Sequence, residues 1–150
     1  MAKSKRATNV KKKAKPPRSA PDTSQTPSTL PSFPIVGIGA SAGGLEACTQ
    51  LLHALPQIDI ALIIVQHLAP EHESFLTELL AAATPMPVKQ VSDGMKIKPG
   101  HVYVIPPNVQ LKIADGVLRL SPRPMDRSQH MPIDFFFRSL AEYAQSRAIG

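Results

Sequence analysis

The chain has 150 residues, with 17 Lys and Arg against 11 Asp and Glu and a single cysteine. Residues 1–33 carry eight basic side chains against Asp22, a net charge of +7, whereas residues 34–150 carry nine basic against ten acidic, a net charge of −1. A single cysteine excludes an intrachain disulfide and a cysteine-based metal site, and no stretch approaches the roughly 20 apolar residues of a membrane-spanning helix. We therefore expect a near-neutral domain in the cytoplasm, preceded by a basic tail.

The tail, residues 1–33, is rich in Lys, Pro, Ser and Thr and has almost nothing to bury. We predict that it is disordered. Its basic run at 11–15 is able to bind nucleic acid or an anionic membrane without specificity. A solubilising role is the favoured interpretation, so we expect no specific nucleic-acid partner. The remaining residues, 34–150, form the predicted domain.

From Pro34 onward, strand and helix patterns alternate. Apolar, β-prone runs predict strands at 35–39, 58–65, 88–91 and 101–105. Helical spacing predicts helices at 43–55, 71–83 and from 132 to about 147. The apolar faces expected for the last two are Phe75, Leu76, Leu79 and Leu80, and then Phe136, Phe137, Leu140 and Ala144.

Two further patterns complete the domain. The runs 109–113 and 117–120 alternate around Asp115-Gly116, which predicts a hairpin or an antiparallel pair at the sheet edge. Residues 148–150 resemble the start of another strand. The strand–helix order predicts an α/β fold, a doubly wound and mostly parallel sheet in a Rossmann-like three-layer arrangement.

The turn after the first strand reads Gly39-Ala-Ser-Ala-Gly43, the Gly-x-Ser-x-Gly pattern of an exposed nucleophilic serine. Ser41 is the predicted nucleophile, and the backbone N–H groups of Ala42 and Gly43 are the candidate oxyanion donors. His67 follows the second strand, so neighbouring strands would bring it to the same edge as Ser41, where it is the predicted general base.

Each of these residues also has a plainer interpretation. Ser41 suits a turn or a helix N-cap, and His67 suits the point where a buried strand reaches the surface. Gly37-x-Gly39-x-x-Ala42 also fits a permissive dinucleotide fingerprint, but the second strand ends in Gln66 and His67 where that fold needs an acidic residue. Nucleotide binding is therefore the weakest interpretation. Cys48, within a helix pattern, is expected to be a small buried hydrophobe.

Several blocks together resemble the catalytic domain of the CheB family of chemotaxis receptor methylesterases, over about residues 34–150. They are Val36-Gly-Ile-Gly-Ala-Ser-Ala-Gly-Gly44, Val65-Gln-His-Leu68, Asp93-Gly94, Pro99-Gly-His-Val-Tyr-Val-Ile-Pro-Pro107 and Pro132-Ile-Asp-Phe-Phe-Phe-Arg-Ser-Leu140.

The resemblance implies a serine hydrolase that demethylates glutamyl methyl esters on the cytoplasmic helices of chemoreceptors and, in many members, deamidates receptor glutamines. The family's nucleophile falls on Ser41 and its histidine on His67. It implies neither a metal nor an organic cofactor. The wording of the block at 132–140 resembles members without a receiver domain, some of them fused to a receptor methyltransferase, and this suggests such a module as a partner.

The chain departs from the family pattern in two ways. The catalytic aspartate of the family lies after the strand that begins at Ala148, so we expect the chain to be incomplete at its carboxyl end and to lack the triad Asp. In serine proteases, the corresponding change lowers the rate by about 10⁴-fold. Residues 1–33 are also too short and too polar for a receiver domain. The alternative function is therefore a catalytically inactive domain that binds receptors or acts as an adaptor.

Overall fold

The computed structural model describes residues 30–41, 43–66, 75–124 and 131–150. Its centre is a five-stranded sheet in the order β3-β5-β2-β1-β8, and every pair of neighbours in it is parallel. The strands are β1 Ile35–Ala40, β2 Ala61–Gln66, β3 Val88–Gln90, β5 His101–Val104 and β8 Ala148–Ile149. The predicted strands are all present, and the sheet is parallel as expected.

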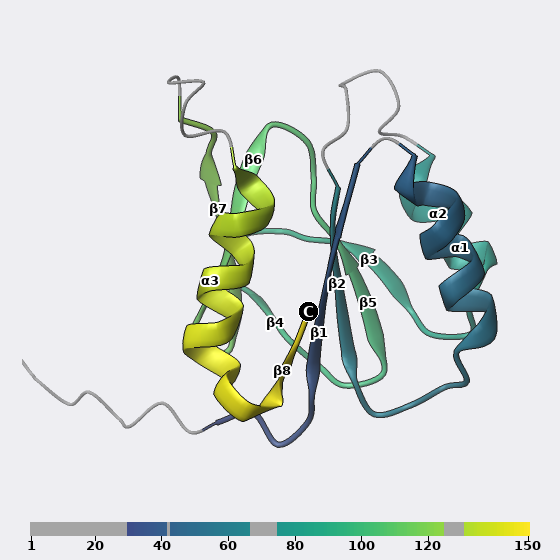
Figure 1. Cartoon of the computed structure of the whole chain (residues 1–150), viewed down its shortest axis with the longest axis horizontal. Helices are drawn as coiled ribbons and strands as arrows, with labels where there is room; N and C mark the ends of the chain where they lie inside the picture. The colour runs from purple at the N-terminus through teal and green to yellow at the C-terminus, as the bar shows by residue number, and fades with distance from the viewer. Residues whose placement is uncertain (1–29, 42, 67–74, 125–130) are drawn as a thin grey trace, which may run out of the picture.

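Helices cover both faces of this sheet (Figure 1). Helices α1, Gly44–Ala54, and α2, Leu76–Ala82, lie on one face, and α3, Pro132–Ala144, lies on the other. A short 3₁₀ turn, Gln145–Arg147, joins α3 to β8. The doubly wound, three-layer α/β fold predicted from the alternation of patterns is confirmed.

The central strands serve both faces because successive side chains of a strand point in opposite directions. Strand β2 is buried along its whole length. Its Ile63 and Val65 belong to the core cluster that contains Phe136 and Leu140 of α3. Its Leu62 and Ile64 belong to the cluster beneath α1 and α2. A continuous apolar run is therefore what a central strand covered on both faces requires.

A second, antiparallel sheet has the order β4-β7-β6. It consists of β4, Met95–Lys96, β6, Val109–Ala114, and β7, Val117–Pro122. The predicted hairpin is present, and Asp115 and Gly116 have φ values of 52° and 75°, as a tight hairpin turn requires. The hairpin pairs with β4 and does not extend the edge of the parallel sheet. The two residues of β4 were too few to produce a pattern in the sequence.

Two side-chain hydroxyl groups form hydrogen bonds with backbone groups of neighbouring segments. The Tyr103 hydroxyl, on the buried strand β5, accepts a hydrogen bond from the Lys98 N–H at 2.9 Å. The Ser139 Oγ, on α3, accepts one from the Ile113 N–H of β6 at 3.1 Å and donates to the Phe136 carbonyl at 2.8 Å. Ser139 therefore satisfies a backbone donor on a strand that lies at the edge of the second sheet.

The predicted apolar face of α2 is only half right. Leu76 and Leu80 are buried, whereas Phe75 is 66% exposed and Leu79 is 51% exposed. Leu76 and Leu80 are four residues apart and share one side of the helix. That side packs on the sheet, and the adjacent side of this short helix faces solvent. The start predicted for this helix, residues 71–74, lies outside the described residues.

The predicted tail lies outside the described residues except for its last four positions. Of these, Phe33 packs against the cluster on the α3 side, and the Ser32 carbonyl accepts a hydrogen bond from Arg147 at 3.2 Å. The domain boundary after residue 33 stays a prediction. Among the described residues, no helix has the length and apolar character that crossing a membrane requires.

Candidate functional site

The candidate site lies where β1 and β2 end, at the upper edge of the sheet in Figure 1. The two strands are parallel neighbours, and their register pairs Ala40 with Gln66. Ser41 follows Ala40 directly and is exposed. The adjacency of the two strands, on which the pairing of Ser41 with His67 depended, is therefore present. His67 and Ala42 lie outside the described residues.

The turn that carries Ser41 is held through the Ser41 carbonyl. This oxygen accepts a hydrogen bond from the Gly44 N–H at 2.9 Å and another from the Gln66 Nε2 at 3.0 Å. Helix α1 then begins at Gly44, with Gly43 as its N-cap and no side chain capping it. Ser41 is therefore not the N-cap, and its hydroxyl makes no hydrogen bond to any described residue.

Two glycines of the motif have a structural reason that the sequence did not reveal. A Cβ on Gly37 would lie 2.8 Å from Leu140 and 2.9 Å from Phe136, and a Cβ on Gly39 would lie 2.6 Å from Ile133. Helix α3 thus packs directly on the backbone of β1. The spacing Gly37-x-Gly39 is explained by this packing, which removes the main reason for the nucleotide interpretation.

Gly43 differs from these two glycines, because a Cβ there would meet no described residue within 4 Å. The residue is exposed, at the amino end of α1 beside Ser41. Open space next to the turn is what a substrate carbonyl would need in order to reach backbone N–H groups at a helix amino terminus. The role predicted for the Gly43 N–H stays a prediction.

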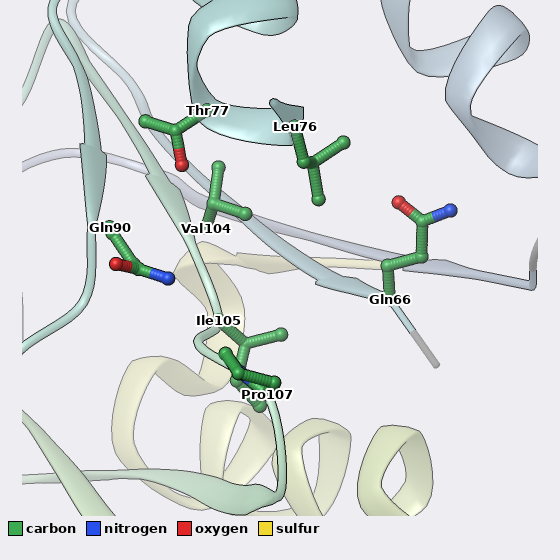
Figure 2. Close-up of a pocket in the computed structure, with 7 residues that line it drawn as sticks. All are labelled: Gln66, Leu76, Thr77, Gln90, Val104, Ile105 and Pro107. Atoms are coloured by element: carbon green, nitrogen blue, oxygen red, sulfur yellow. The ribbon is translucent and has the colours of Figure 1, made fainter. Parts of the chain in front are cut away.

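Gln66 is the site residue that the sequence analysis did not identify. It is 5% exposed, and while its Nε2 bonds to Ser41, its Oε1 has no hydrogen-bond partner among the described residues. Figure 2 shows the amide oxygen turned toward the side of Leu76 and the nitrogen turned away from it. A polar residue at the end of an otherwise apolar strand was the signal that could have drawn attention to it.

The described residues line two cavities near this edge. The smaller, about 10 Å³, has room for about one water molecule. It is lined by Gln66, Leu76, Thr77, Gln90, Val104, Ile105 and Pro107 (Figure 2). The larger, about 270 Å³, lies at the start of α3, between that helix and the second sheet. Its lining consists of Gln110, Pro124, Met131, Asp134, Phe135 and Arg138.

Neither the cysteine nor a metal-binding cluster contributes to the described part of the site. Cys48 is 4% exposed, and burial raises the pKa of its thiol, so it is the buried small residue that the sequence predicted. Within the described ranges, no group of three or more His, Cys, Asp or Glu is arranged to hold a metal ion.

The model of the family described as CheB methylesterase matches residues 36–150. A protein-glutamate methylesterase/protein-glutamine glutaminase of Yersinia pestis bv. Antiqua is 37% identical over 131 residues, which cover 85% of this chain and 37% of the relative. The protein of the same name in Salmonella typhimurium is 35% identical over 146 residues, covering 89% of this chain and 40% of the relative. The chain thus spans well under half the length of these relatives.

A solved structure agrees with the sequence comparisons. The crystal structure of the Thermotoga maritima CheB methylesterase catalytic domain superposes with a TM-score of 0.66 at 30% sequence identity. The match covers 78% of this chain and 65% of that one.

Proposed function

The chain belongs to the CheB methylesterase family, and from this we propose that it is a serine hydrolase acting as a protein-glutamate methylesterase. The observation that carries the proposal is the register of β1 with β2. Ala40 and Gln66 are paired, and the residues that directly follow them in the sequence are Ser41 and His67. In α/β proteins, ligand-binding and catalytic sites form at the carboxyl ends of neighbouring parallel strands.

In the proposed mechanism, the Ser41 hydroxyl attacks the carbonyl carbon of a glutamyl methyl ester while His67 accepts its proton. The tetrahedral oxyanion is stabilised by the N–H groups of Ala42 and Gly43. Protonation by His67 releases methanol and leaves a glutamyl ester on Ser41. A water molecule, deprotonated by His67, then hydrolyses this ester and regenerates the serine with a free glutamate.

The third member of the triad has no proposed position within residues 34–150. The family resemblance places the aspartate that orients the histidine after the strand beginning at Ala148. No residue of 34–150 is therefore assigned to that role.

The proposed substrates are glutamyl methyl esters, and glutamine amides in a deamidation reaction, on the cytoplasmic helices of chemoreceptors. The named relatives support both activities, because their names combine a glutamate methylesterase with a glutamine glutaminase. The cytoplasm follows as the proposed compartment, because the receptor helices lie there. A receptor methyltransferase module is the second proposed partner, on the resemblance of the block at 132–140 to receiver-less members.

The first prediction tests Ser41. In the intact protein, Ser41→Ala is expected to abolish methanol release from a methylated receptor segment, because it removes the hydroxyl that attacks the ester in the proposed mechanism. Ser92→Ala is the matched control, since Ser92 is exposed and lies in the turn before β4. Methanol release and binding of the receptor segment are measured in parallel.

Methanol release by Ser41→Ala at the wild-type rate would contradict the assignment. Receptor binding without methanol release by the wild-type chain would instead favour the non-catalytic alternative.

A further inference from the structure

The amide of Gln66 is held in one orientation by its surroundings. Gln66 ends β2, and its side chain lies on the α1 and α2 side of the sheet, as do those of Leu62 and Ile64. Its Nε2 lies 3.0 Å from the Ser41 carbonyl. A carbonyl oxygen only accepts hydrogen bonds, so the nitrogen of the amide must face it and the oxygen must face the other way.

This orientation leaves a buried acceptor unpaired. Gln66 is 5% exposed, and its Oε1 has no partner among the described residues. Buried polar atoms without partners are rare, because each one loses its hydrogen bonds to water without replacement. An apolar residue would avoid this penalty at the end of a strand that is apolar elsewhere. The bond made by the nitrogen is therefore the property that distinguishes Gln66 from its apolar neighbours.

The Ser41 carbonyl is saturated by its two donors. It accepts the Gly44 N–H at 2.9 Å from the helix side and the Gln66 Nε2 from the strand side. A carbonyl with two hydrogen bonds from rigid elements has little freedom to rotate. Since a peptide unit is planar, this carbonyl and the N–H of residue 42 turn together.

We propose that Gln66 is a positioning residue, which clamps the Ser41 carbonyl and thereby orients the peptide unit that supplies the first oxyanion donor. This rests on the proposed esterase function of Ser41. Gln66 does not touch the substrate. It sets the direction of an N–H group whose alignment matters most in the transition state, where negative charge develops on the oxyanion.

The test compares Gln66→Met with Gln90→Met in the full chain. Methionine has a similar length to glutamine and removes both the donor and the unpaired acceptor. Because the Ser41 carbonyl keeps the Gly44 bond, the melting temperature of Gln66→Met is expected to stay close to that of the wild type. Gln90 lines the same small cavity from β3 but is exposed and makes no hydrogen bond with the Ser41 turn, so it is the matched control.

Two readouts are expected to change in Gln66→Met alone. Hydrogen exchange of the Gly44 amide, which reports on the turn directly, should become about tenfold faster. The kcat for methanol release should fall about 10- to 100-fold, less than the loss of a whole oxyanion donor, while KM changes by less than about threefold. Gln66→Glu, which keeps the shape but replaces the donor by a carboxylate, should not restore kcat at neutral pH.

The outcomes separate the two proposals. Unchanged Gly44 exchange in Gln66→Met would overturn the clamp, and so would faster exchange with an unchanged kcat. A fall in kcat that is accompanied by a clearly lower melting temperature would also overturn the clamp. So would an equal fall in kcat in Gln90→Met. Faster exchange in a protein whose wild type releases no methanol would support the clamp on the turn and contradict the esterase function.

Discussion

Gly39 lies where β1 passes beneath the first turn of α3. A Cβ at this position would lie 2.6 Å from the Ile133 Cγ2 and 3.2 Å from Phe137. The Ile133 methyl is attached at a branched Cβ, so it is stiff and cannot move aside as the end of a long side chain would. The helix would have to shift away from the strand that positions Ser41.

Gly39→Ala is therefore expected to lower the free energy of unfolding by about 2 kcal/mol, within the range typical of overpacked cores. Gly43→Ala, where a Cβ meets none of the described residues within 4 Å and φ is −83°, should cost less than about 1 kcal/mol. Urea denaturation of both variants measures the difference. Equal losses at the two positions would show that α3 does not press on the strand as described.

For single residues, the sequence drew attention to the glycines of β1 but did not reveal why the structure needs them. Gly37 and Gly39 fitted a permissive dinucleotide fingerprint, but the space beside both glycines is occupied by side chains of α3. These contacts join residues 94 to 103 positions apart in the sequence, so no local pattern could reveal them. Gln66 was missed for the same reason, because its role depends on a carbonyl 25 residues earlier.

Between elements, Ser139 joins α3 to the edge of the second sheet. Ser139→Ala would leave the Ile113 N–H, in a buried part of β6, without its acceptor. Leaving such a donor unpaired costs about 1–3 kcal/mol, and we expect a loss near the lower end because only one bond to the strand is removed. Thermal or urea denaturation measures it.

The matched control is Ser146→Ala, in the exposed 3₁₀ turn after α3. Its stability should stay within about 0.5 kcal/mol of the wild type, as for ordinary surface substitutions. If Ser139→Ala were as stable as this control, the Ile113 N–H would have to find another hydrogen-bond acceptor.

Most elements could be predicted because their patterns are local. The unbroken apolar run of β2 and the alternation around Asp115-Gly116 each follow from the burial of one short segment. The errors arose where the outcome depends on what covers an element. On α2, the periodicity identified an apolar surface but could not show that only the side with Leu76 and Leu80 is covered.

Across the whole molecule, two tyrosines link stability to alkaline pH. Burial raises the pKa of Tyr103, against the opposing effect of its bond from the Lys98 N–H, and burial together with the Asp115 charge raises the pKa of Tyr143. A pKa raised above its unfolded value of about 10 favours the neutral form in the folded state. This contribution is complete below pH 10 and is lost as pH rises through the folded values.

The free energy of unfolding is therefore expected to fall as pH rises above about 10. Tyr103→Phe should be less stable than the wild type near pH 8, because the Lys98 N–H loses its acceptor. Its stability should also fall less steeply above pH 10, because one of the two tyrosines is gone. Urea denaturation at pH 8, 10 and 11 tests both parts, and parallel pH curves for the two proteins would contradict the role of Tyr103.

The position of β8 has a consequence for how the protein folds during its synthesis. Strand β1 pairs on one side with β2 but on the other with β8, so Ile35 lies beside Ala148. A ribosome adds about 5–20 residues per second, so β1 and the turn with Ser41 emerge roughly ten seconds before this partner. Until then one edge of β1 is open to other chains. Nascent chains stalled before residue 148 should therefore bind chaperones more strongly than chains in which an added linker after residue 150 lets β8 leave the ribosome.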